Sequence, residues 1–89
     1  MSTSPYSFGS RLRAHRERQG ITLQEIAERT KIGHRVFAEL ERDDVSHWPK
    51  GIFRKAFLRE YTRAIDMPFE PTWAEFQELF PEEGAPRLG

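Results

Sequence analysis

Apolar residues recur every three or four positions along most of the chain, which is the spacing of one face of an α-helix. Phe8 and Leu12 begin the first such segment, and Gly20 follows it. Glycine readily adopts the left-handed conformation of a helix C-cap, so the pattern predicts a helix over about residues 8–19. No segment alternates apolar and polar residues for long enough to indicate a β-strand. The predicted class is therefore all-α.

The next two predicted helices are short and lie close together in the sequence. Thr22 and Glu25 have the spacing of a capping box, in which the threonine hydroxyl accepts from a backbone amide and the glutamate reaches back to the threonine amide. They predict a helix over about residues 23–30. Gly33 is an acceptable N-cap for a third helix over about residues 34–42. The apolar residues expected to seal this pair against the core are Ile26, Ile32, Phe37 and Leu40.

A fourth helix is predicted over residues 51–65, after Pro49 and Gly51 interrupt the chain. Its marker residues are Ile52, Phe57, Leu58, Tyr61 and Ile65. Thr72 is expected to cap a fifth helix, TWAEFQELF, which lies within a C-terminal helical extension at residues 69–81. The apolar stripe of this extension consists of Trp73, Phe76 and Phe80, with Leu79 beside it. Because this stripe is too apolar for a free tail, we expect it to dock on the other helices or on a second subunit.

The length of 89 residues allows one domain, and the expected organisation has four parts. They are a flexible N-terminus at 1–7, a helical domain at 8–68, the helical extension at 69–81, and a tail or linker at 82–89. The net charge of zero hides a division. Residues 1–65 contain 13 Lys plus Arg against 8 Asp plus Glu, whereas residues 66–89 contain one Arg and six acids. A basic body of this kind is compatible with a polyanionic partner or with an ordinary solvated helical surface.

Several classes of function are disfavoured by composition. The chain has no cysteine, which excludes disulfides and thiolate metal sites, and it has no apolar run long enough for a membrane span. We therefore expect a soluble, cytoplasmic chain. His15, His34 and His47 show no metal-ligand spacing with one another, and no phosphate-binding glycine loop or nucleophile motif is present. Neither an enzyme nor a metal or cofactor is predicted.

A short turn between two helices is typical of a helix-turn-helix. The first helix supports the second, and the amino end of the second is left free to enter a DNA major groove. In this chain the residues left outside the predicted core are His34, Arg35, Ala38 and Glu39.

The run RLRAHRERQGITLQEIAERTKIGHRVFAELER resembles the Cro/CI-type (XRE) helix-turn-helix. The continuation DDVSHWPKGIFRKAFLREYTRAIDMP is similar to the variant found at the cytoplasmic amino terminus of RodZ-type cell-shape proteins and related bacterial regulators. The resemblance covers about residues 8–68. It implies a compact five-helix fold and, because one fold hosts more than one activity, two different functions.

The first implied function is DNA binding by a bacterial transcriptional regulator, with the helix at 34–42 in the major groove. By resemblance, Gln24 and the amides near it hold phosphate, while His34, Arg35 and Ala38 face base edges. Arginine can hydrogen-bond guanine in bidentate fashion, so Arg35 is the first candidate for base readout. The candidates for additional backbone contacts are Lys31, Arg42, Arg11 and Lys50. A homodimer would fit half-sites one helical turn apart.

Two acids in the same helix need separate interpretations. Glu39 would oppose phosphate, and it is either a contact to cytosine or simply a solvated residue. Glu41 is expected, by resemblance to the family, to pair with Arg16 and so tie the first helix to the end of the third. Asp43 and Asp44 add further negative charge at the end of this helix.

The second implied function is that of a protein adaptor. RodZ-type domains are partners of the actin-like filament protein MreB, and the resemblance implies a surface around the fourth helix. The matching residues are Phe53, Arg54 and Phe57. Aromatic anchors beside basic residues suit an interface hot spot. The alternative is that Phe57 belongs to the core and Phe53 covers Trp48. The RodZ-type architecture continues into a membrane span, so this chain is expected to be either a piece of a longer protein or a free-standing regulator.

Overall fold

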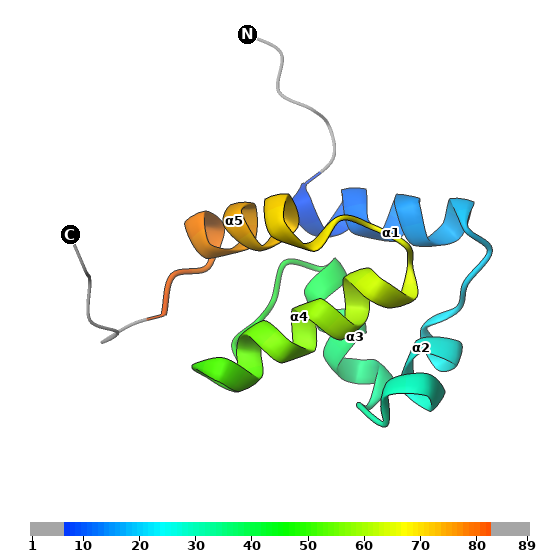
Figure 1. Cartoon of the computed structure of the whole chain (residues 1–89), viewed down its shortest axis with the longest axis horizontal. Coiled ribbons are helices and arrows are strands. Elements are labelled where there is room, and N and C mark those ends of the chain that lie inside the picture. The colour runs from blue at the N-terminus through cyan, green and yellow to red at the C-terminus, as the bar shows by residue number, and fades with distance from the viewer. Residues whose placement is uncertain (1–6, 83–89) are drawn as a thin grey trace, which may run out of the picture.

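The computed structural model describes residues 7–82, and over this range the backbone forms α-helices and no strand. The elements are α1 (Phe8–Arg18), α2 (Leu23–Thr30), α3 (His34–Glu41), α4 (Ile52–Ala64) and α5 (Phe69–Leu79) (Figure 1). The predicted all-α class is confirmed. Except at the start of α5, the helix ends lie within one or two residues of the predicted ends, which is the ordinary uncertainty of a helix terminus. No helix in residues 7–82 has the length and apolar character needed to cross a bilayer.

The predicted flexible N-terminus and C-terminal tail lie outside the described residues, apart from Ser7 and Glu82. Both of these residues make defined contacts. The hydroxyl of Ser7 accepts a hydrogen bond from the amide of Ser10 at 3.2 Å and caps α1. The Glu82 carboxylate accepts from the Gly51 amide at 2.8 Å, which links the end of the described chain to the start of α4.

Local chemistry fixes the start of α2. Both halves of the predicted capping box are present: the Glu25 amide donates to the Thr22 hydroxyl at 3.1 Å, and the Thr22 amide donates to the Glu25 carboxylate at 2.8 Å. The Thr22 amide and the Thr22 hydroxyl both donate to the Glu25 carboxylate, and these bonds lower the pKa of Glu25 below its ordinary value because they favour the charged form.

The start of α5 differs from the prediction. Thr72 does not cap the helix, because α5 begins three residues earlier, at Phe69, directly after Pro68. Thr72 lies inside the helix, and its hydroxyl donates to the Pro68 carbonyl at 2.8 Å. Pro71 fits in the first turn, since the amide that it lacks would have no intrahelical acceptor there.

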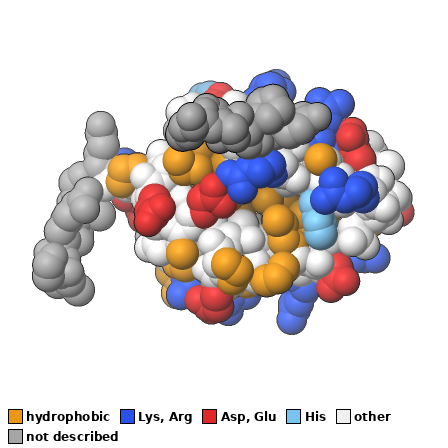
Figure 2. All heavy atoms as spheres, turned by 90° about the horizontal axis from the view of Figure 1, so that it is seen from above, with side chains coloured by type: hydrophobic (Ala, Val, Ile, Leu, Met, Phe, Trp, Pro, Cys, Tyr) orange, Lys and Arg blue, Asp and Glu red, His pale blue; other side chains and the backbone are white. Residues whose placement is uncertain are grey.

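The core draws on every helix and on the loop between α3 and α4. Its members are Phe8, Leu12, Ile26, Phe37, Leu40, Val45, Trp48, Leu58, Tyr61, Ala64, Ile65 and Phe76. Phe76 of α5 is completely buried, with its ring 6.3 Å from that of Phe8 and 5.6 Å from that of Trp48. The apolar stripe of the extension therefore docks on its own chain. Seen from the side of α1 and α5, the surface mixes apolar patches with charges of both signs (Figure 2).

Candidate nucleic-acid interface

The turn between α2 and α3 is held by bonds within α2 and the turn itself. Lys31 ends α2 in the left-handed conformation, with φ of 63°, and its amide donates to the Ala27 carbonyl at 2.8 Å. The Thr30 hydroxyl accepts from the Ile32 amide at 3.2 Å. Gly33 then begins α3 without any side-chain cap. The amino end of α3 is therefore presented at the surface, where a helix start favours an anion.

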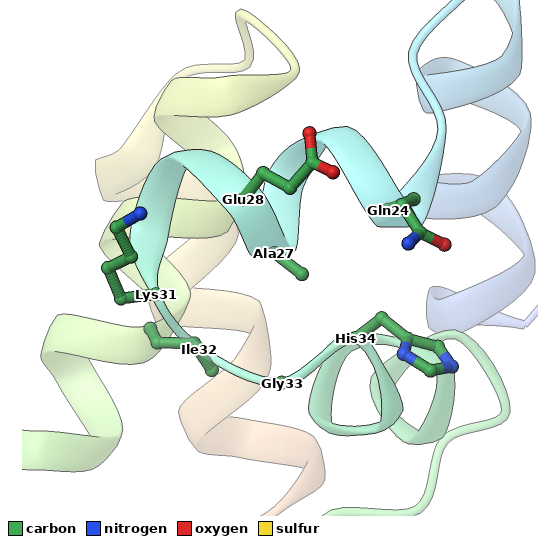
Figure 3. Close-up of a pocket in the computed structure, with 7 residues that line it drawn as sticks. All are labelled: Gln24, Ala27, Glu28, Lys31, Ile32, Gly33 and His34. Carbon is green, nitrogen blue, oxygen red and sulfur yellow. The ribbon is translucent and has the colours of Figure 1, made fainter.

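A shallow hollow of about 350 Å³ lies between α2 and the start of α3 (Figure 3). Gln24 from the first turn of α2 and His34 from the first turn of α3 lie at the same end of it, and the Ala27 methyl points into the gap. The Glu28 side chain points away from His34. Two of the residues predicted to meet DNA, Gln24 and His34, are thus brought together, and both are exposed.

One face of α3 carries the other predicted contacts. Residues 34, 35 and 38 follow helical spacing and lie on one side of the helix, and Arg42 directly follows the last helical residue. His34, Arg35 and Arg42 are exposed, and Ala38 is half-buried. Lys31, also exposed, stands at the end of α2 on the rim of the hollow. This surface, defined by His34, Arg35, Ala38 and Arg42, is called the α3 face below.

Glu39 is not a solvated residue of the α3 face, as one sequence interpretation held. It is 8% exposed and turns toward the loop after α3, where its carboxylate lies 3.5 Å from Nδ1 of His47. Glu39 is therefore not among the exposed residues that would read bases.

Glu41 is buried as well, in an ion pair with Arg16 of α1. The guanidinium donates to the carboxylate through Nε at 2.7 Å and Nη2 at 2.9 Å, and through Nη1 to the Ile21 carbonyl at 2.9 Å. The Tyr61 hydroxyl of α4 donates to the same carboxylate at 2.6 Å. Hydrogen bonding to Glu41 raises the pKa of Arg16, while burial and Glu41 raise the pKa of Tyr61. The network ties α1, α3 and α4 together behind the α3 face.

The two aspartates after α3 also accept hydrogen bonds from nearby groups. Asp43 accepts from the Gly9 amide at 2.8 Å. Asp44 accepts from the Ser46 amide at 3.1 Å and the Ser46 hydroxyl at 2.6 Å, and these bonds lower the pKa of Asp44. Each acid near the end of α3 therefore has a partner away from the α3 face.

The two additional cations proposed from sequence differ in their surroundings. Arg11 forms an ion pair with Glu75 of α5, which raises the pKa of Arg11. This contact joins α1 to α5 and removes Arg11 from the set of free phosphate contacts. Lys50 is exposed in the loop before α4.

Of the three residues predicted to contact a protein partner, Arg54 is buried, which corrects that prediction. Arg54 is only 6% exposed and donates to the carbonyls of Pro49 at 3.0 Å and Phe80 at 3.4 Å, so it joins α4 to the end of α5 rather than facing a partner. Phe57 is half-buried, with its ring 5.8 Å from that of Trp48. Phe53 does not cover Trp48, because it is 64% exposed.

Ile52, one of the residues that marked the predicted fourth helix, is 76% exposed and stands next to Phe53 in the first turn. Helical spacing alone could not show that Ile52 and Phe53 are exposed, since the first turn of α4 lies at the edge of the protein.

Comparison with known proteins agrees with this geometry. Residues 11–71 match a family described as "Helix-turn-helix domain". The chain is also 30% identical over 61 residues to the cytoskeleton protein RodZ of Streptococcus pneumoniae, an alignment that covers 68% of this chain and 22% of that protein. The chain thus spans about a fifth of the length of this relative. No solved structure matches the chain. The chain therefore belongs to this helix-turn-helix family, and over the aligned residues it is similar to a RodZ-type protein.

Proposed function

We propose that the domain binds double-stranded DNA as the reading part of a bacterial transcriptional regulator, with α3 in the major groove. The observation that carries this proposal is the separation of charge around α3. Glu39 and Glu41, the two acids of the helix, are 8% and 7% exposed, whereas Arg35 and Arg42 are exposed. The face that would meet DNA therefore presents cations without an adjacent carboxylate from its own helix.

Each residue of the surface has a distinct role in this proposal. Arg35 is the base-reading residue, because an arginine in the first turn of a recognition helix can reach guanine O6 and N7. His34 and Ala38 stand beside it and contact neighbouring base edges. Gln24, Lys31 and Arg42 contact the phosphate backbone, which fixes the position of the helix in the groove without reading sequence.

The first experiment selects the purified domain on a randomised duplex DNA pool at two salt concentrations. The expected result is enrichment of one motif, with affinity that falls steeply as salt rises. The salt dependence arises because lysine and arginine side chains that bind phosphates release the counterions of the DNA. Binding without any enriched motif would contradict the proposed base readout by Arg35.

The second experiment measures two variants on the selected site. Arg35→Ala should weaken binding by about 5- to 150-fold, equivalent to about 1 to 3 kcal/mol, and relax specificity at one base pair. Arg63→Ala is the matched control, since it removes the same charge from an exposed position on α4. Equal losses in the two variants would show that only net charge matters. The size of the protein–DNA complex would also show whether one copy or a homodimer binds.

A second candidate function is that of a protein adaptor for a cytoskeletal partner of the MreB type. The exposed Ile52 and Phe53 favour it, because a large aromatic side chain that remains 64% exposed on a small domain suits an interface anchor. The matched relative from Streptococcus pneumoniae is a cytoskeleton protein, which agrees with this candidate.

Co-sedimentation with a purified actin-like filament protein tests the adaptor function. Phe53→Ala should reduce the bound fraction at least tenfold if the ring is an interface anchor. Leu79→Ala, which trims another exposed apolar side chain on α5, is the control and should have little effect. Absence of co-sedimentation by the unmodified chain would remove this candidate.

A further inference from the structure

The carboxyl end of α3 brings together three side chains of the kind that bind metal ions. Glu39 comes from the helix, and Asp44 and His47 come from the loop that follows it. One ligand atom from each lies within 4.8 Å of the other two. The spacing of the three histidines gave no indication of this group, because it contains one histidine and two acids that a turn of the backbone places side by side.

Glu39 provides a second, independent observation that favours a cation at this group. Its side chain is nine-tenths buried, and its carboxylate is turned into this group, 3.5 Å from the imidazole of His47. Burying a carboxylate costs free energy unless a charge or good hydrogen bonds compensate it. The imidazole of His47 is the side chain that the structure pairs with this carboxylate. A metal ion between the two groups would bind both the carboxylate and the imidazole.

Asp44 is prepared for a cation by its own loop. The amide and hydroxyl of Ser46 both donate to Oδ1 of Asp44, at 3.1 and 2.6 Å. These bonds orient the carboxylate and favour its charged form. Ligating carboxylates are commonly held in this way by hydrogen bonds from groups behind them.

We propose that Glu39, Asp44 and His47 bind a first-row divalent cation, with Zn²⁺ as the expected ion. Two carboxylate oxygens and one imidazole nitrogen suit Zn²⁺, and three protein ligands leave a fourth position for water. The two negative charges of the acids balance the charge of the ion. Ligand distances of about 2.0 to 2.2 Å require the group to contract, and the His47 side chain, 76% exposed, is free to move inward. The bound ion would fasten the end of α3 to the following loop.

Calorimetric titration of the full chain with zinc chloride, without DNA, tests this site separately from the proposed DNA binding. One ion per chain is expected. Glu39→Gln and His47→Ala should each reduce the affinity at least tenfold. Glu78→Gln, which removes one exposed acid from α5, is the matched control and should leave it unchanged. Failure to bind one ion, or equal affinity in the unmodified chain and in His47→Ala, would overturn the proposal.

Two further measurements keep the result independent of folding defects in the variants. Free Zn²⁺ at ten times its dissociation constant should raise the thermal midpoint of the unmodified chain by about 6 to 11 °C and leave that of His47→Ala unchanged. Mn²⁺, as a paramagnetic probe, should selectively broaden the amide signals of residues 39–47. Broadening centred on other residues would place the ion elsewhere and overturn the assignment.

Discussion

Replacement of Arg16 by methionine tests how strongly one buried ion pair holds α1 against α3. In the unmodified chain the Arg16 and Glu41 side chains are 10% and 5% exposed and share two hydrogen bonds. The variant removes both bonds and the one to the Ile21 carbonyl, and it leaves the Glu41 carboxylate with only the Tyr61 hydroxyl. Removing one partner of a buried pair costs about 3 to 5 kcal/mol, because the other charge stays buried without compensation.

This cost is large for a small domain, whose total stability is about 5 to 15 kcal/mol. The thermal midpoint should fall by at least about 12 °C, since each kcal/mol corresponds to about 4 to 8 °C at this chain length. Urea unfolding followed by circular dichroism gives the free energy directly. Arg13→Met is the matched control, because Arg13 pairs with Glu17 at 3.1 Å on an exposed face of the same helix. Its cost should stay below about 1 kcal/mol.

The triple variant Arg16→Met, Glu41→Leu and Tyr61→Phe distinguishes a stranded charge from lost packing. It removes the three polar side chains of the network together, so none of them stays buried without a partner, and only the Ile21 carbonyl loses a donor. Apolar replacement of a whole buried ion pair is often neutral or stabilising, so the triple variant should recover most of the stability lost in Arg16→Met. A loss below about 1 kcal/mol in Arg16→Met, or a triple variant no more stable than it, would refute the reasoning.

Three other changes probe the packing behind α3. Gly9→Ala should destabilise the domain by about 1 to 3 kcal/mol, measured by urea unfolding, because the new Cβ would lie 2.5 Å from the carbonyl oxygen of Glu41. Phe76→Ala should cost about 3 to 5 kcal/mol in the same assay, since this completely buried ring joins α5 to the core; a cost below 1 kcal/mol would show that α5 is not docked in solution. The raised pKa of Tyr61 predicts a stability term that is fully present below the unfolded value of about 10 and is lost as pH rises above it. Unfolding measured between pH 9 and 11 should show a smaller decline in Tyr61→Phe than in the unmodified chain, and identical declines would contradict this assignment.

Features that depend on neighbouring residues were predicted well from the sequence. The capping box of Thr22 and Glu25 joins residues three positions apart, so its two hydrogen bonds follow from local geometry. Helical periodicity placed Phe37 and Leu40 in the core for the same reason. The short turn before α3 also followed from local signals, and with it the exposure of His34 and Arg35.

Features that depend on distant partners were decided by the tertiary structure. Periodicity alone left Glu39 on the solvent side of α3, but the loop after the helix turns back and buries it beside His47. The sequence placed Arg54 on a partner surface. In the folded chain Arg54 instead donates hydrogen bonds to the carbonyls of Pro49 and Phe80, where α5 packs on α4. The amino-acid sequence alone therefore determined the helices and the exposed start of α3, because backbone hydrogen bonds and apolar spacing act over a few residues. Which charges remain on the surface was decided only by the folded chain, because burial and compensation of a charge depend on groups that are remote in the sequence.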